Sequence, residues 1–246
     1  WAAAMIALGV QPGQHVGLFM PTCPQFIEAF YGIAMAGAVA VPVNARYQSH
    51  ELAYLARDAD LVALVTAGQV AESLDYRDRV RAALPSLAQF GEGTGLQLDE
   101  APMLHTVVSL DGPGQGADQP GMLPASRALA LGEHVDAGEI DRRIDDVDGE
   151  DIAMILYTSG TTSHPKGAMI SHRGQVGNSR NLGRRYECTI ADKVWSPLPI
   201  FHIAGILPMT MILDLGGTYM TVPHFDAGQA LEMLGREGAK IGRAHV

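Results

Sequence analysis

The sequence predicts an α/β fold in which doubly wound, mainly parallel sheets are flanked by helices. Short apolar runs of strand length, such as residues 16–20 and 61–65, alternate with longer segments whose apolar residues recur at helical spacing. The order strand, helix, strand, helix, strand is typical of a parallel sheet with right-handed crossovers. The 246 residues, 47% of them apolar, are enough for a sizeable core in one or two domains.

The first half of the chain predicts successive strand and helix units. Residues 1–8 have helical spacing, and the apolar run 16–20 predicts a strand buried on both faces. Pro24 suits the first turn of the next helix, whose apolar face runs as far as Gly37. Ser49 is expected to cap a further helix. The other elements predicted here are strands at 38–43, 61–65 and 106–110 and a helix at 76–84.

The second half continues this alternation. The acidic run 141–151 is interpreted as a solvated surface connection and not as a metal site. Residues 152–156 are all apolar and predict another buried strand. Ser171 suits the start of one helix, and Asp226 with Gln229 has capping-box spacing for another. The other elements predicted here are strands at 168–170, 193–196 and 218–222 and a very apolar helix at 203–213.

The ends of the sequence bear on its domain organisation. We expect a first α/β subdomain over residues 1–150 and the start of a second over 151–240. Trp1 stands where a complete reading frame would have methionine, and it enters directly into a helical pattern. Residues 241–246 match the translation of a common short-read sequencing adapter, so they are expected to be a read-through artefact, with natural residues as the alternative. We therefore expect a fragment.

Composition excludes several classes of protein. A formal net charge of -10 and a pI near 5.3 argue against nucleic acid as the main partner. Cys23 and Cys188 are far apart without metal-ligand spacing, so neither a disulfide framework nor a metal site is predicted, and a cytoplasmic location is the default. The longest uncharged apolar run, 29–43, is shorter than the roughly 18 residues of a membrane span. No signal peptide is predicted.

One stretch is richer in hydroxyl groups and glycine than any other. Residues 157–167 read Tyr-Thr-Ser-Gly-Thr-Thr-Ser-His-Pro-Lys-Gly and follow the predicted strand 152–156 directly. The hydroxyl groups between Thr158 and Thr162 can donate to phosphate oxygens, Lys166 adds a cation, and the two glycines allow backbone turns. The stretch therefore predicts a phosphate-binding loop that a buried strand holds still.

Two other interpretations of this stretch fit less well. The P-loop of nucleotide triphosphatases requires G-x-x-x-x-G-K-[ST]. Counting from Gly160, Pro165 stands at the second glycine position and Gly167 at the final hydroxyl position, so the pattern fails. A surface turn rich in serine and threonine would not account for the Pro-Lys-Gly ending.

Over all eleven residues the stretch resembles the signature loop of the adenylate-forming (AMP-binding) superfamily, which includes acyl-CoA synthetases, firefly-type luciferases and adenylation domains of peptide synthetases. The family pattern is aromatic-Thr-Ser-Gly-Thr-Thr-Gly-x-Pro-Lys-Gly. Ser163 replaces one glycine, and we expect altered loop mobility with retained binding. Residues 34–43 also resemble the family's Lys-Ala-Gly-Ala-x-Val-Pro segment, early in its large N-terminal domain. The resemblance assigns to nucleotide binding Thr158, Ser159, Gly160, Thr161, Thr162, Ser163 and Lys166.

A second motif at 197–202, Pro-Leu-Pro-Ile-Phe-His, resembles the family's Pro-Leu-Phe-His element. A histidine before an apolar helix is by itself more often a packing or capping residue, but its place after the signature loop makes His202 the candidate catalytic residue. Relatives that activate amino acids have Phe-Asp here, because an ammonium group taken out of water needs a carboxylate partner. We therefore expect a fatty, aryl or other non-amino carboxylic acid. Ile203, Ile206 and Leu207 are expected either in the core or beside an apolar pocket.

The resemblance implies an acid-thiol ligase. Such an enzyme forms an acyl adenylate and pyrophosphate from ATP and a small-molecule carboxylic acid, here a fatty or aryl acid, and then a thioester with CoA. ATP, Mg²⁺ and CoA are the expected cofactors. The family's aromatic-Gly-x-Thr-Glu motif and C-terminal lysine do not occur in these residues, so this chain alone is expected to be inactive. Two alternatives stay open: an adenylation domain that loads a carrier protein, and a non-catalytic nucleotide-binding module.

Overall fold

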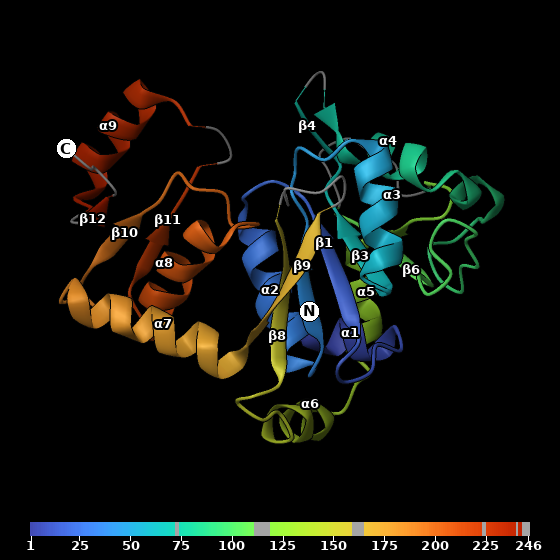
Figure 1. The fold of residues 1–246 in the computed structure, drawn as a ribbon, viewed down its shortest axis with the longest axis horizontal. Coiled ribbons are helices and arrows are strands. Elements are labelled where there is room, and N and C mark those ends of the chain that lie inside the picture. Colours follow the sequence, from blue (N-terminus) through green and yellow to red (C-terminus); the bar gives the residue numbers. More distant parts are fainter. Residues whose placement is uncertain (72–73, 111–118, 159–164, 223–224, 240, 243–246) are drawn as a thin grey trace.

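The computed structural model describes residues 1–71, 74–110, 119–158, 165–222, 225–239 and 241–242. Within these residues a seven-stranded sheet occupies the centre of the molecule (Figure 1). Its strands are β1 (His15–Phe19), β2 (Val39–Pro42), β3 (Leu61–Thr66), β6 (Thr106–Ser109), β7 (Leu123–Pro124), β8 (Ile152–Thr158) and β9 (Lys166–Ser171). Their order is β7-β6-β3-β1-β2-β8-β9, and all neighbours are parallel except β8 and β9. The predicted mainly parallel α/β fold is confirmed.

The winding of this sheet reverses between β1 and β3. The chain leaves β1 toward β2 on one side, and it leaves β3 toward β6 on the other. In open α/β sheets such a reversal opens a crevice at the carboxyl ends of the strands, where ligands bind. Gly17 allows the two strands to pack here, because a Cβ on it would lie 2.8 Å from Cδ1 of both Leu61 and Leu64.

Helices cover both faces of the central sheet. They are α1 (Ala2–Ala7), α2 (Pro24–Met35), α3 (Ser49–Asp58), α4 (Tyr76–Ala83), the 3-10 helix η1 (Pro85–Gln89), α5 (Ala125–Gly132) and α6 (Ala137–Asp145). Helices α2, α5 and α6 pack around α1, whereas α3 packs against α4. Right-handed crossovers that run in opposite directions place helices on opposite faces, which accounts for these two groups.

The start of α3 corrects one prediction. Ser49 was expected to cap this helix, but its cap is Gln48, whose backbone is extended (φ -81°, ψ 170°). The carboxylate of Glu51 accepts a 2.9 Å hydrogen bond from the Gln48 backbone N–H. A serine one position inside the helix leaves the capping to its neighbour, because the reciprocal glutamate lies three residues after Gln48.

The acidic run is only in part the surface connection that its charge predicts. Its first residues belong to α6, and Arg143 of that helix is 9% exposed. Its Nη1 donates to the carbonyl oxygens of Val10 at 2.8 Å and Ala36 at 3.1 Å, and its Nε donates to Glu139. One arginine among acidic neighbours thus anchors α6 below α1 and α2.

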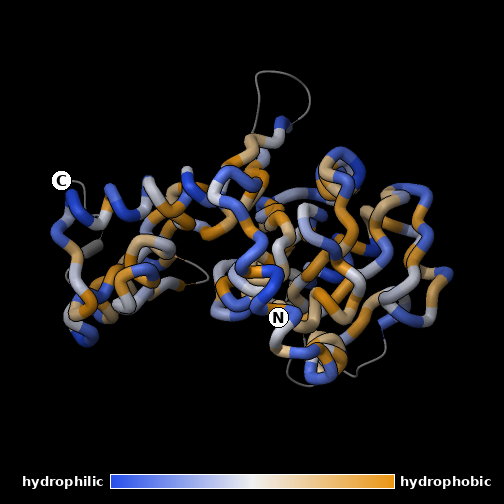
Figure 2. The backbone as a smooth tube through the Cα atoms, turned by 90° about the horizontal axis from the view of Figure 1, so that it is seen from below, coloured by the Kyte–Doolittle hydropathy of each residue, from blue (hydrophilic) through white to orange (hydrophobic). Residues whose placement is uncertain are grey.

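A smaller parallel sheet follows in the C-terminal third, on the left of Figure 1. Its order is β11 (Thr218–Met220), β10 (Lys193–Trp195) and β12 (Ile241–Gly242), with helices α7 (His172–Arg185), α8 (Ile203–Asp214) and α9 (Ala227–Glu237). A short hairpin, β4 (Gln69–Ala71) and β5 (Leu74–Asp75), stands apart. Figure 2 shows hydrophobic stretches gathered inside the larger body and hydrophilic stretches along its outline.

Helix α8 and the segment before it pack on the core of the central sheet, because Ile200, Ile206 and Met209 belong to the same buried cluster as the central strands. The smaller sheet has a second buried cluster, formed by Val194, Met211 and Ile212. The central sheet also includes residues on both sides of position 150, since β8 and β9 complete it. The expected division of the chain into subdomains at 150 stays a prediction.

Candidate active site

The predicted phosphate-binding loop joins the two strands of an antiparallel hairpin. Thr158 at the end of β8 pairs directly with Lys166 at the start of β9, and both residues are exposed. The two ends of the loop therefore lie side by side at the carboxyl end of β8. The other predicted phosphate ligands lie outside the described residues: Ser159, Gly160, Thr161, Thr162 and Ser163.

The last glycine of the motif has a different role from the predicted one. Gly167 was expected to allow a turn, but it lies in β9 opposite Tyr157. A Cβ on Gly167 would lie 2.8 Å from Cγ2 of Ile155 and 3.3 Å from the Tyr157 ring. The glycine therefore lets the aromatic ring of the motif lie across the hairpin.

The Tyr157 ring reaches a carboxylate from another part of the fold. Its phenol donates a 2.6 Å hydrogen bond to Oδ2 of Asp58, at the end of α3. Burial is the largest cause that raises the pKa of Tyr157 far above its usual value, and the hydrogen bond to Asp58 is the second. The phenol therefore stays neutral. The sequence analysis did not identify Asp58, because no motif near it indicates that it binds Tyr157, 99 residues further along the chain.

The segment before His202 contacts the carboxyl end of β1. The Ile200 N–H donates to the hydroxyl of Thr22 at 3.3 Å, and Thr22 follows β1 in the chain. The same segment packs on Gly205 of α8, where a Cβ would clash with the backbone of Pro199 and lie 2.8 Å from the Leu198 carbonyl oxygen. Because β1, β2 and β8 are parallel, this segment and the phosphate loop lie at the same edge of the sheet.

His202 caps α8, with an extended backbone (φ -123°, ψ 147°) and an exposed side chain. Its Nδ1 accepts a 3.2 Å hydrogen bond from the Ala204 N–H. An Nδ1 that accepts a bond carries no proton, so the neutral imidazole holds its proton on Nε2. The capping role that the sequence offered as an alternative is therefore present, and Nε2 remains as a donor.

The apolar side chains after His202 differ in how deeply they are buried. Ile206 is fully buried in the core, whereas Ile203 and Leu207 are half-buried. Ile203 also packs against the core, so a place beside an apolar pocket stays a prediction for the two half-buried residues.

A cavity of about 1000 Å³ opens at the same edge of the sheet. Its walls include Pro21 and Cys23 after β1, Gly68 after β3, Leu110 after β6 and Tyr219 of β11. Neither Lys166 nor His202 lines it. The cavity lies where the winding of the sheet reverses, at the carboxyl ends of β1 and β3.

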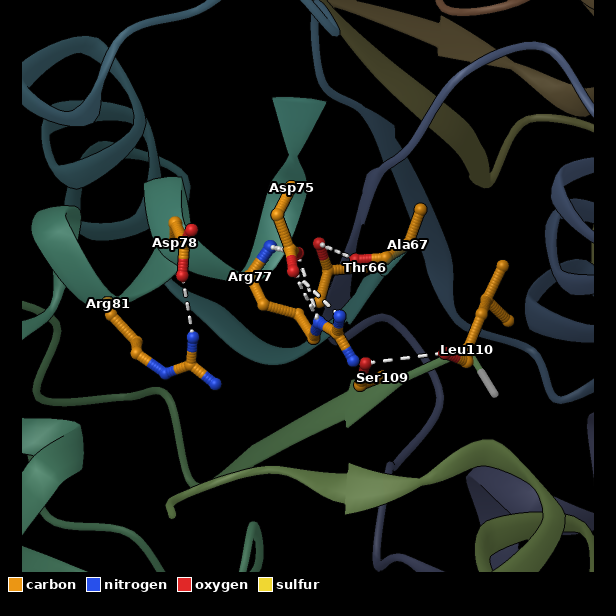
Figure 3. A network of polar contacts seen from close by, with 8 residues as sticks. All are labelled: Thr66, Ala67, Asp75, Arg77, Asp78, Arg81, Ser109 and Leu110. Carbon is orange, nitrogen blue, oxygen red and sulfur yellow. Dashed lines mark hydrogen bonds and ion pairs between the residues drawn. The ribbon is translucent and has the colours of Figure 1, made fainter. Parts of the chain in front are cut away.

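A buried ion pair supports this edge (Figure 3). Arg77 is 4% exposed, and its guanidinium binds the Asp75 carboxylate through Nε at 2.9 Å and Nη2 at 2.6 Å. Beside it, the Thr66 hydroxyl donates to the Phe19 carbonyl oxygen at 3.0 Å and so ties the carboxyl end of β3 to that of β1.

The sequence matches the family model described as AMP-binding enzyme over residues 1–242. The chain therefore belongs to the AMP-binding enzyme family, which confirms the resemblance of its signature loop. The relatives that it matches include acyl-CoA ligases. It is 28% identical over 243 residues to the long-chain-fatty-acid–CoA ligase FadD13 of Mycobacterium tuberculosis, covering 99% of this chain and 41% of that protein. It is 30% identical over 245 residues to the mitochondrial medium-chain acyl-CoA ligase ACSF2 of Homo sapiens, covering 96% and 38%.

Solved structures agree with the fold. The N-terminal domain of FACL13 from Mycobacterium tuberculosis superposes with a TM-score of 0.72 at 26% identity, covering 98% of this chain and 52% of that chain. ATP-bound MatB from Rhodopseudomonas palustris gives 0.71 at 26% identity, covering 96% and 40%. The chain spans between 38% and 43% of the length of the curated relatives that it matches.

The described residues contain neither a cluster of metal ligands nor a helix suited to a membrane. No three His, Cys, Asp or Glu side chains within them are grouped so as to hold a metal ion. No helix in the same part of the chain combines the length and the apolar character of a membrane span.

Proposed function

We propose that the protein carrying this chain activates a carboxylic acid with ATP to an acyl adenylate and then transfers the acyl group to CoA. The observation that carries the proposal is the pairing of Thr158 with Lys166 at the sheet edge that also holds the His202 segment. In this proposal the loop that these two residues bound binds phosphate, and His202 donates to the carboxylate of the acid. The acyl-CoA ligase relatives support this assignment.

The chemistry explains why the loop matters. A carboxylate is a poor acyl donor because its oxide is a poor leaving group, and transfer of AMP converts that oxide into a good one. Pyrophosphate departs with developing negative charge, which must be met by donors already in place. The Thr158 hydroxyl and the Lys166 ammonium are the described candidates, each hydrogen bond to a charged oxygen contributing about 1.5 to 3 kcal/mol. An overall charge of -10 makes such local donors necessary.

We expect Mg²⁺ to bind at this site together with ATP, mainly through the phosphates of the nucleotide. The described residues offer no cluster of three ligands, and Mg²⁺ in nucleotide sites is commonly held by phosphate oxygens, waters and only one or two carboxylates. When bound, the ion neutralises phosphate charge.

The expected substrate is a fatty, aryl or other non-amino carboxylic acid. The Nε2–H of His202 is a donor suited to a substrate carboxylate, and an imidazole offers no negative charge to hold an α-ammonium group. The half-buried Ile203 and Leu207 add apolar surface beside it.

ATP-pyrophosphate exchange tests both statements. The polypeptide encoded by the complete gene should exchange label in the presence of fatty or aryl acids, and thioester should form when CoA is added. Exchange with α-amino acids alone would overturn the substrate class. Adenylate that passes to a carrier protein but not to CoA would favour an adenylation domain, and no exchange with any acid would favour a non-catalytic module.

A further inference from the structure

Asp58 lies between two tyrosines that come from different parts of the chain. Oδ2 accepts from the Tyr157 phenol at 2.6 Å, and Oδ1 accepts from the Tyr54 phenol at 3.0 Å. Tyr54 is one turn away on α3 itself, whereas Tyr157 is the residue before Thr158. One bond therefore stays within a helix, and the other joins that helix to the hairpin of the phosphate loop.

The end of this hairpin has few other attachments within the described fold. β2 and β8 are in register at Ala40 and Met154, so the last residue of β2, Pro42, is level with Leu156. Tyr157 and Thr158 consequently extend past the end of β2. On the other side β9 is the outermost strand of the sheet. The tip of the hairpin is thus held by its own ladder, by packing of the Tyr157 ring against the core and by the Tyr157 to Asp58 bond, which is its hydrogen bond to α3.

We propose that Asp58 is a positioning residue for the phosphate loop: its carboxylate holds Tyr157, and through Tyr157 it holds the paired loop ends Thr158 and Lys166. The inference rests on the proposed function and extends it to a residue outside both motifs. Donors that stabilise departing pyrophosphate act only if they are in place before the bond breaks. Loss of the attachment therefore affects turnover more than it affects binding of the acid.

Variants at the two ends of the bond test this proposal in the polypeptide encoded by the complete gene. Asp58→Ala and Tyr157→Phe should each lower kcat of ATP-pyrophosphate exchange by about tenfold while KM for the acid stays within about twofold. The double variant should be no worse than either single one, because both remove the same bond. Two losses that multiply, or a change in KM alone, would overturn the proposal.

Tyr54→Phe is the matched control. It removes the other hydrogen bond to the same carboxylate but leaves the Tyr157 bond intact. It should keep kcat within about twofold of the unmodified protein, and all variants should melt within a few degrees of one another. An equal loss in Tyr54→Phe would mean that the carboxylate only stabilises α3.

Hydrogen exchange provides a readout that needs no activity. Peptides that contain Thr158 and Lys166 should exchange at least threefold faster in Asp58→Ala and Tyr157→Phe than in Tyr54→Phe, because the hairpin tip opens more often. Unchanged exchange would overturn the positioning role. The unmodified protein could show no ATP-pyrophosphate exchange with any acid while its amide hydrogen exchange changes in the variants as expected. The proposed function would then fail, but the attachment of the hairpin to Asp58 would stand.

Discussion

The backbone of Pro199 occupies the space that a side chain on Gly205 would need. Through this contact α8 packs directly on the segment that ends in His202, and the Thr22 hydroxyl holds the same segment from the side of β1. The position of the imidazole therefore depends on a residue that has no functional group.

Gly205→Ala should destabilise the protein by about 1 to 3 kcal/mol, because the added methyl group must displace backbone and not a flexible side chain. Urea unfolding measures the loss, and ATP-pyrophosphate exchange should fall with it. Gly177→Ala in α7 is the control, since nothing lies within 4 Å of a Cβ there. That change should stabilise by about 0.5 to 1 kcal/mol. Equal effects at both glycines would contradict the packing argument.

Two substitutions at His202 separate its capping role from its proposed catalytic role. His202→Asn keeps a side-chain oxygen for the Ala204 N–H but loses the Nε2 donor, so stability should be retained while exchange falls by tenfold or more. His202→Ala removes the cap as well and should cost about a further 1 kcal/mol of stability. Full activity in His202→Asn, measured beside a melting curve, would assign the histidine to capping alone.

Lys166→Ala should reduce exchange by about a hundredfold, the usual loss when one preorganised donor to a developing anion is removed. Its effect on the melting temperature should be small, because an exposed cation contributes little to folding. Arg185→Ala, an equally charged change at the exposed end of α7, should leave exchange near its original value. If both variants exchange label equally well, Lys166 does not contact phosphate.

The Asp75 and Arg77 pair predicts a pH dependence of stability. Burial raises the pKa of Asp75, but the hydrogen bonds and charge of Arg77 outweigh burial and lower the pKa below its usual value. A carboxyl group whose pKa is lower in the folded than in the unfolded protein stabilises the folded state at pH values above its unfolded pKa of about 3.9. This stabilisation is lost as the pH falls through the folded pKa. Asp75→Asn should therefore cost about 3 kcal/mol at pH 7 and less at pH 3, which lies below the unfolded value.

Urea unfolding at both pH values measures this difference. Asp78→Asn is the comparison, because Asp78 forms an exposed pair with Arg81 (Figure 3). It should cost at most about 1 kcal/mol at either pH. A cost for Asp75→Asn that is the same at pH 7 and at pH 3 would rule out the linkage.

The sequence predicts the parts of the fold whose signal is local. The apolar runs at 16–20 and 61–65 match β1 and β3 within one residue, because a strand buried on both faces carries few polar side chains. Ser171 and Asp226 cap their helices as predicted. The packing roles of Gly167 and Gly205 and the bond between Asp58 and Tyr157 were not predictable in this way. They depend on partners that only the folded chain brings together.

The pairing of β2 with β8 also has a consequence for the order of folding. β1 pairs with both β2 and β3, which are close to it in sequence, whereas Ala40 of β2 pairs with Met154, which follows β3, β6 and β7 in the chain. Bringing the ends of so long a segment together costs conformational entropy before the contacts between β2 and β8 can form. The N-terminal strands are also synthesised first. We expect the hairpin of β8 and β9 to join the sheet late. A folding intermediate would then possess a formed hydrophobic core before it could bind a nucleotide.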